Sequence, residues 1–356
     1  MKPTVLVLQE QVPPYRVPLF RSVAQVLSSH GLHLRVASSS VLDGADALGF
    51  RHVRARMSQG GLAALDTVLR ERPTALVLPH SGRFAPIAFA ARLLPGCGRS
   101  QLFWGMGLAR RYRGGSPADR RPAGEAVRYL MLSACDHYLS YTGLSTQNLV
   151  VSGFDGSRIT TLNNAVEPLA SPEEATAAQR VPLQALFVAS LVEDKEPLAA
   201  VEIVNKLRCL APSATLHIVG DGPLRLQCER AANRYDWVHY HGPQRGRSLR
   251  ELALASDIAI IPGRVGLAVL EMATAGLPMV TFSGSPHGAE IAYLEDGING
   301  LLLNGDVETS AKEIWALLTD REALERMRNE ALSITRTYTV QNMAAKFAQG
   351  VMASLS

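Results

Sequence analysis

The chain lacks several features that would assign it to a familiar class. No apolar run in its 356 residues approaches the ~20 residues that a membrane-spanning helix requires. Four cysteines are present, and none forms a C-x-x-C pair, which argues against a zinc site or a disulfide framework. The N-terminus lacks the charged and small-residue flanks of a signal peptide. We therefore expect a protein of the reducing cytoplasm.

An excess of charge of one sign is also missing from the chain as a whole. Lys and Arg number 36 against 32 for Asp and Glu, which argues against a dedicated nucleic-acid binder. One short stretch is strongly basic, and its arginines are Arg110, Arg111, Arg113, Arg120, Arg121 and Arg128. Two interpretations stay open for this stretch: an ordinary solvated face, or contact with an anionic membrane or a pyrophosphate-bearing acceptor.

The hydrophobic pattern predicts two α/β domains. Short β-branched runs alternate with helical patterns, as in parallel βαβ units. The expected strands of the first half are 5–8, 32–37, 75–78, 101–104, 137–141 and 159–162, with helices such as 18–28 and 85–94. Those of the second half are 185–188, 215–219, 238–240, 258–261 and 278–281. The length exceeds the ~250 to 300 residues that one core usually supports.

The domain boundaries follow from composition. A polar segment with two prolines, residues 167–180, reads as a linker between residues 1–166 and residues 181–338. The last segment, 339–356, contains a helix with apolar residues at Met343, Ala344, Phe347 and Val351.

The run from Ile258 to Thr281 is the most informative stretch. It reads as a strand, a turn, a helix that opens on Gly266 and Leu267, and a second strand. Free backbone N–H groups at such a helix start favour an anion, and Glu271 follows one turn later on the same face. A nucleoside diphosphate fits this pattern.

Several motifs together resemble retaining, nucleotide-sugar-dependent glycosyltransferases of family 4, which have the GT-B fold. Besides the 258–281 run, these are Gly-Asp-Gly-Pro at 220–223 and a lysine, Lys195, shortly after the strand at 185–188. Pro-Tyr-Arg-x-Pro at 14–18 and Trp-Gly-Met-Gly at 104–107 are similar to a subgroup of that family. The likeness spans nearly the whole chain and implies two Rossmann-like doubly wound parallel-sheet domains that face a cleft. It also implies that the helix of residues 339–356 returns to the N-terminal domain.

The resemblance implies a set of functional residues on three surfaces. The candidate catalytic residues are Lys195, Glu271, Arg16 and His287. The candidate donor-binding residues are Ser190, Gly220, Gly222, Pro223, Gly242, Gly263, Arg264, Gly266, Leu267 and Glu271, with Glu271 on the ribose. The candidate acceptor-side residues are Tyr15, Arg16, Trp104, Gly105, Met106, Arg110 and Arg111.

The chain departs from the family pattern at three positions. Met106 replaces a histidine and cannot transfer a proton, and Ser190 replaces an arginine that contacts the diphosphate. Gly263 stands where the E-x7-E motif has its first glutamate, which normally holds the sugar hydroxyls. Binding of the diphosphate is therefore expected to depend on Lys195, Arg16 or Arg264.

The expected activity is transfer of a sugar, with retention, from a UDP- or GDP-sugar to an acceptor hydroxyl. No Asp-x-Asp pair is present in a loop, so we expect basic side chains in place of a metal ion. The acceptor is a glycan, a lipid-linked sugar or a small molecule, in cell-surface polysaccharide or natural-product synthesis. The alternatives are a binding protein with impaired catalysis, a GT-B sugar-nucleotide epimerase and, least favoured, a dinucleotide-dependent oxidoreductase, because no G-x-G-x-x-G follows the first strand.

Overall fold

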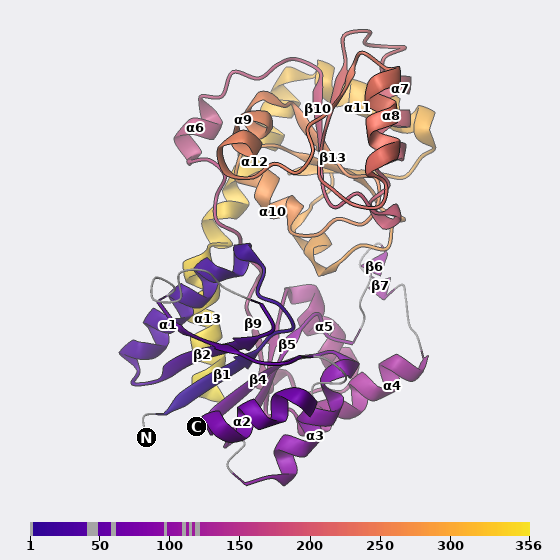
Figure 1. Cartoon of the computed structure of the whole chain (residues 1–356). Coiled ribbons are helices and arrows are strands. Elements are labelled where there is room, and N and C mark those ends of the chain that lie inside the picture. Colours follow the sequence, from indigo (N-terminus) through magenta and orange to yellow (C-terminus); the bar gives the residue numbers. More distant parts are fainter. Residues whose placement is uncertain are drawn as a thin grey trace. The chain divides into compact units, whose positions relative to one another are not determined.

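A computed structural model describes residues 3–40, 49–57, 62–95, 98–108, 112–113, 116–117 and 122–356. The described residues form two compact units. One lies within 1–110, 119–167 and 338–356, and the other within 111–118 and 168–337. We call them the N-terminal and the C-terminal unit and describe each by itself (Figure 1).

The N-terminal unit is built on a seven-stranded parallel sheet with the order β3-β2-β1-β4-β5-β8-β9. Its strands are β1 (Thr4–Leu8), β2 (His33–Ser38), β3 (Arg51–Arg54), β4 (Ala75–Pro79), β5 (Ser100–Gly105), β8 (His137–Ser140) and β9 (Ile159–Thr161). All five residues of β1 are buried, because helices cover both faces of the sheet. Its alternate residues enter two separate hydrophobic clusters.

The helices of this unit form one layer on each face of the sheet. They are α1 (Val17–Ser29), α2 (Leu65–Glu71), α3 (Ala85–Leu93), α4 (Pro122–Met131), α5 (Gly143–Val151) and α13 (Val340–Ala353). Helices α1 and α13 pack side by side and share one cluster with Val5 and Val7 (Figure 1). Helices α2, α3, α4 and α5 contribute to the other cluster, with Leu6 and Leu8.

The C-terminal unit has a six-stranded parallel sheet with the order β12-β11-β10-β13-β14-β15. Its strands are β10 (Gln184–Val188), β11 (Thr215–Val219), β12 (Val238–Tyr240), β13 (Ile258–Ile260), β14 (Met279–Phe282) and β15 (Gly300–Leu303). Its helices are α6 (Pro172–Thr176), α7 (Pro197–Leu207), α8 (Arg225–Arg234), α9 (Gly246–Ala255), α10 (Ala268–Ala273), α11 (Val307–Thr319) and α12 (Arg321–Thr337). Strands β6 (Tyr112–Arg113) and β7 (Ser116–Pro117) form a separate antiparallel pair.

Both sheets reverse their winding direction beside their first strand. Strand β1 lies between β2 and β4, and β10 lies between β11 and β13. In doubly wound sheets, ligands bind at such a reversal, outside the carboxyl ends of the strands. The predicted α/β class with two doubly wound parallel sheets is thus confirmed.

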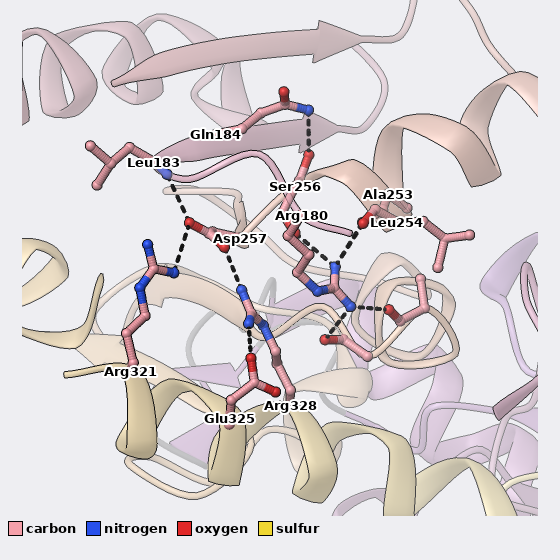
Figure 2. Close-up of polar contacts among 12 residues, drawn as sticks. Arg180, Leu183, Gln184, Ala253, Leu254, Ser256, Asp257, Arg321, Glu325 and Arg328 are labelled. Atoms are coloured by element: carbon pink, nitrogen blue, oxygen red, sulfur yellow. Dashed lines mark hydrogen bonds and ion pairs between the residues drawn. The ribbon is translucent and has the colours of Figure 1, made fainter. Parts of the chain in front are cut away.

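A buried ion cluster fixes the opposite, N-terminal edge of the C-terminal sheet (Figure 2). The carboxylate of Asp257, which is fully buried, pairs with Arg328 of α12 and accepts the N–H of Leu183 at 2.7 Å. The guanidinium of Arg180 donates to carbonyl oxygens at the ends of α9 and α10, among them Ser256 at 2.7 Å and Ala275 at 2.8 Å. Burial, and then the charge of Arg328, lower the pKa of Arg180 to about 10. These contacts anchor the segment that leads into β10 and helix α12 to one point.

Candidate functional site

Four loops meet at the carboxyl edge of the C-terminal sheet, and backbone hydrogen bonds join them. The N–H of Leu191, after β10, donates to the carbonyl oxygen of Asp221, after β11, at 2.9 Å. The N–H of Arg264, after β13, donates to the oxygen of Asp194 at 2.6 Å. The N–H of Gly288, after β14, donates to the carbonyl oxygen of Val265 at 3.4 Å. The loops therefore form one layer over the reversal between β10 and β13.

Close backbone contacts require three of the predicted glycines. Gly220 and Gly222 have φ of 149° and 155°, which side-chain-bearing residues rarely adopt. A Cβ on Gly222 would also lie 2.6 Å from the carbonyl oxygen of Leu191. At Gly263, a Cβ would clash with the oxygen of Asp194 and lie 2.7 Å from the carbonyl carbon of Lys195. The glycine that interrupts the E-x7-E pattern is therefore a packing requirement here.

Lys195 lies at the reversal point itself. It ends a short 3-10 helix (Glu193–Lys195), and its Nζ donates to the carbonyl oxygen of Arg264. The same Nζ is 3.7 Å from where a Cβ on Gly266 would be. Burial, and then the charge of Arg264, lower the pKa of Lys195 to about 8, against the opposing effects of Asp194 and Glu290. A half-buried ammonium thus links the loop after β10 to the loop after β13.

Arg264 is a second cation of this loop layer. Its Nε donates to Oδ2 of Asp194 at 2.8 Å, and both side chains stay partly exposed. The pair partly neutralises Arg264 in this structure. Its predicted contact with a diphosphate stays a prediction, and it requires the guanidinium to share or leave Asp194.

Glu271 lies on α10 between the buried side chains of Leu270 and Met272. Helix α10 begins at Ala268, two residues later than Gly266, with Leu267 as its N-cap. Burial raises the pKa of Glu271, and Arg245 opposes this shift. Arg245 directly precedes α9, in the loop after β12, and no sequence motif indicates that it lies near Glu271. The predicted contact of Glu271 with a ribose remains untested.

His287 is buried, and both nitrogens of its ring bind the protein. Its Nδ1 accepts the N–H of Val265 at 3.2 Å, and its Nε2 lies 2.7 Å from the carbonyl oxygen of Phe282. Burial is the main cause that lowers its pKa. These contacts fit a neutral ring that positions the loop after β13. They do not support the contact with sugar or phosphate that the resemblance implies.

Arg16 and Trp104, two of the predicted acceptor-side residues, lie together at the carboxyl edge of the N-terminal sheet. The guanidinium carbon of Arg16 lies 4.2 Å from the ring centroid of Trp104. Its Nη2 donates to the hydroxyl of Tyr141 at 3.0 Å, and its Nη1 donates to Gln9 at 3.3 Å. Tyr141 follows β8 and was not predicted from the sequence. Arg16 is therefore held in place by groups from several loops, which supports binding or positioning at this edge.

The turn that carries Gly105 and Met106 packs tightly. A Cβ on Gly105 would lie 3.0 Å from the Tyr138 hydroxyl. Next to it, His80 has its Nδ1 2.8 Å from that hydroxyl and its Nε2 2.9 Å from the carbonyl oxygen of Arg128. His80 is buried and was missed by the sequence analysis. Both ring nitrogens of His80 contact groups within the fold. His80 therefore does not take over the role of the histidine that the family pattern has at position 106.

Most of the basic stretch lies outside the described residues. Residues 109–111, 114–115 and 118–121 are among those not described, so Arg110, Arg111, Arg120 and Arg121 cannot be placed. The side chain of Arg113 is not described either. Arg128 is described, is 3% exposed and donates to the carbonyl oxygen of Gly107 at 3.1 Å. Its inclusion in a lipid-facing cluster was wrong, because the side chain is part of the core.

The fold built around these loops is the GT-B fold. HepE of Anabaena, crystallised with UDP, superposes with a TM-score of 0.71 at 15% identity, covering 99% of this chain and 100% of that one. A glycosyltransferase of Rickettsia africae gives a TM-score of 0.72 at 14% identity, covering 99% and 98%. At these identities the likeness establishes the fold alone.

The family model that matches this chain covers residues of the C-terminal unit. Residues 182–320 match the family model described as Glycosyl transferases group 1. A sulfoquinovosyl transferase of Arabidopsis thaliana is 29% identical over 143 residues, 39% of this chain and 28% of that protein. A glycogen synthase of Mycobacterium tuberculosis is 25% identical over 205 residues, 56% of this chain and 49% of that protein. The chain therefore matches less than half the length of either relative.

Among the residues that the structure describes, the helices are too short or too polar to span a membrane. No group of three or more His, Cys, Asp or Glu side chains in those ranges is arranged to hold a metal ion.

Proposed function

We propose that the protein is a glycosyltransferase that moves a sugar from a nucleoside diphosphate sugar, UDP- or GDP-linked, to an acceptor hydroxyl. One observation carries the proposal: a half-buried lysine ammonium at the reversal between β10 and β13, within the region that matches a glycosyltransferase family. Ligands of doubly wound sheets bind at this point, and a bound diphosphate would offset the burial of the cation.

Each loop of the layer has a defined part in this proposal. Lys195 binds the diphosphate, and Arg264 assists it from the neighbouring loop. Gly220 and Gly222 let the loop after β11 lie against the loop after β10. Glu271 accepts hydrogen bonds from the ribose hydroxyls, because a carboxylate at the half-exposed face of α10 is an acceptor there.

We propose transfer with retention and without a metal ion. The bond from the anomeric carbon to the diphosphate oxygen breaks as the bond to the acceptor oxygen forms on the same face. The departing phosphate oxygen takes the acceptor proton, so the step needs no protein nucleophile. Lys195 and Arg264 stabilise the charge that develops on the diphosphate.

The acceptor side of the proposal involves the N-terminal unit. Arg16 and Trp104 lie together at its carboxyl edge, near the turn of Gly105 and Met106. We propose a glycan, lipid-linked or small-molecule acceptor in polysaccharide or natural-product synthesis. The arginines at 110–121 support contact with an anionic membrane on its cytoplasmic side, whereas the buried Arg128 takes no part in it.

Nucleotide binding tests the donor site directly. UDP or GDP at 100 times its dissociation constant should add ~2.7 kcal/mol to the stability of the protein, visible as a rise in Tm. Lys195→Ala should abolish most of this rise, whereas Lys206→Ala, an exposed lysine at the end of α7, should keep it. An equal rise in both variants would place the nucleotide elsewhere. Incubation with a panel of nucleotide sugars then identifies the donor by its slow hydrolysis.

The second candidate function is binding of a sugar nucleotide with impaired catalysis, because three polar groups of the family pattern are absent. Ser190 is exposed, Met106 cannot transfer a proton, and the close contacts at Gly263 leave no space for a carboxylate side chain. Tight nucleotide binding without hydrolysis or transfer of any donor would favour this reading. An epimerase has less support, because His287 uses both ring nitrogens within the fold.

A further inference from the structure

A cavity of about 620 Å³ lies at the N-terminal edge of the N-terminal sheet. Its wall includes the starts of three strands, at Thr4, His33 and Arg51, together with the end of α2 at Glu71 and Arg72. This edge is opposite to the carboxyl edge where Arg16 and Trp104 lie, so the cavity is separate from both candidate binding edges described above. Its volume is within the ~300 to 1,000 Å³ that small-molecule sites occupy.

The charged groups of this cavity do not balance. Glu71 pairs with Arg35, and its other oxygen lies 3.5 Å from Arg51. Among the described residues, no acid pairs with Arg72, which also lines the cavity. The described residues that line the cavity thus include three arginines and one acidic residue. Arg51 has a side chain that is 62% exposed, so it can reach a ligand while it stays near Glu71.

The backbone at Arg72 is held in an uncommon conformation at the wall of the cavity. Arg72 is the C-cap of α2 and has a left-handed backbone conformation with φ of 42°. Its N–H donates to the carbonyl oxygen of Val68 at 2.9 Å. Glycine is the usual residue at such a helix end, because a Cβ there costs roughly 1 kcal/mol. Replacement of Arg72 by glycine therefore removes the guanidinium without adding backbone strain at this helix end.

The inner wall of the cavity is apolar. Leu32, Leu34 and Phe50 line it and are each less than a tenth exposed. A ligand that fits both parts carries an anionic group for the arginines and a compact apolar body for this wall. Planar guanidinium groups bind carboxylates and phosphates with two parallel hydrogen bonds.

We propose that this cavity is a second ligand site, specific for a small organic oxyanion with an apolar body. The oxyanion binds Arg51 and Arg72 at the rim, and Arg35 completes the site from within. Binding here is independent of the proposed transfer reaction and requires no change at the donor site.

Calorimetric titration with four probes tests the proposal. Phenyl phosphate and benzoate carry both the anionic group and the apolar body. Inorganic phosphate carries the anionic group alone, and benzyl alcohol carries the apolar body without a charge. We expect one of the first two probes to bind at least tenfold more tightly than inorganic phosphate, and benzyl alcohol not to bind. The better of the two tells whether the site prefers a phosphate or a carboxylate.

Variants separate this site from the donor site. Arg51→Gln and Arg72→Gly should each weaken the best probe about tenfold or more, since each removes a charge-assisted hydrogen bond. Arg70→Gln is the matched control, because Arg70 lies on the same helix, is 69% exposed and pairs with Asp66 at 2.5 Å. Arg72→Gly relieves the left-handed strain, so weaker binding by this variant cannot result from unfolding.

UDP binding serves as the internal reference. The arginine variants should bind UDP as the parent does, and Lys195→Ala should bind the best probe as the parent does. Equal affinity of the probe for Arg51→Gln, Arg72→Gly and Arg70→Gln would overturn the proposal. So would probe binding that saturating UDP or Lys195→Ala removes, because the probe would then occupy the donor site.

Discussion

Lys195 joins two loops, and its protonation should control donor binding. Its pKa of about 8 means that the free protein loses the ammonium as pH rises through that value. If the charged form alone binds the diphosphate, the Kd for UDP stays level below pH 8 and rises up to tenfold for each pH unit above it. Calorimetry between pH 6.5 and 9.5 measures this change. Lys195→Arg is the control, because arginine stays charged throughout the range.

The burial of Lys195 also makes the stability of the folded protein depend on pH. Stability changes with pH in the direction opposite to that of UDP affinity. The folded pKa of Lys195 lies below its ordinary value of 10.5, so the unfolded chain binds the additional proton between pH 8 and 10.5. The contribution of this lysine to stability therefore increases with pH in that window. A loss of UDP affinity above pH 8 thus cannot be ascribed to destabilisation by Lys195 itself.

Gly263 offers a second test at the residue scale. In Gly263→Ala the new methyl group would lie 2.7 Å from the carbonyl carbon of Lys195, so the loop after β10 must move and UDP should bind at least tenfold more weakly. Gly284→Ala is the control, since Gly284 follows β14 outside the proposed donor-binding set and no atom lies within 4 Å of its new methyl group. Equal UDP affinities of the two variants, measured by calorimetry, would mean that the position of Lys195 does not depend on this contact.

Some residues of the candidate site could be predicted from local sequence patterns. Others could not, because only the tertiary fold brings them to the site. Lys195 follows a buried strand at a characteristic spacing, so it could be selected without coordinates. Arg245 and Tyr141 lie far along the chain from the residues they affect, and only the order of the strands brings them near Glu271 and Arg16. His287 has a suitable residue type, but its burial and its two hydrogen bonds depend on tertiary packing.

At the scale of elements, the predicted strands agree with the structure, but four observed strands were not predicted: β3, β15 and the short antiparallel pair β6 and β7. Strands 215–219 and 238–240 were predicted with the bounds observed, and the other predicted strands differ by at most one residue at either end. Strand β3 was missed because Arg51–Arg54 is an edge strand without buried residues, so it has no apolar pattern. Strand β15, Gly300–Leu303, was missed because it is an edge strand of its sheet that begins with glycine, a residue depleted in strands.

Helix α12 depends on one buried ion pair. Arg328→Met should lower the Tm of the C-terminal unit and cost about 3–5 kcal/mol, because Asp257 would lose its close partner inside the protein. Scanning calorimetry measures the loss. Arg326→Met is the control on the same helix, since Arg326 is exposed and lies 3.7 Å from Glu322. Similar Tm values for the two variants would show that solvent or Arg321 compensates at Asp257.

At the scale of the whole molecule, the chain contributes its last helix to the unit with which it begins. Met343, Phe347 and Val351 of α13 are buried in one cluster with residues of α1 and β1. The ring of Phe347 lies 5.4 Å from that of Trp104, centroid to centroid. The apolar spacing in the last segment predicted a helix, and the resemblance to the family implied that this helix returns to the N-terminal domain.

This arrangement predicts that a change in α13 affects one unit and spares the other. Phe347→Ala should destabilise the N-terminal unit by about 3–5 kcal/mol, because it leaves a cavity beside Trp104. Scanning calorimetry should show an earlier transition for that unit, while Gln349→Ala, an exposed neighbour, should leave it unchanged.

UDP binding distinguishes local from global damage in this variant. All residues of the proposed donor site lie within the C-terminal unit. Phe347→Ala should therefore bind UDP with a Kd within about twofold of the parent below the first transition, even if transfer to an acceptor fails. A parallel loss of UDP affinity would mean that α13 also supports the C-terminal unit, and that the two units do not respond separately to mutation.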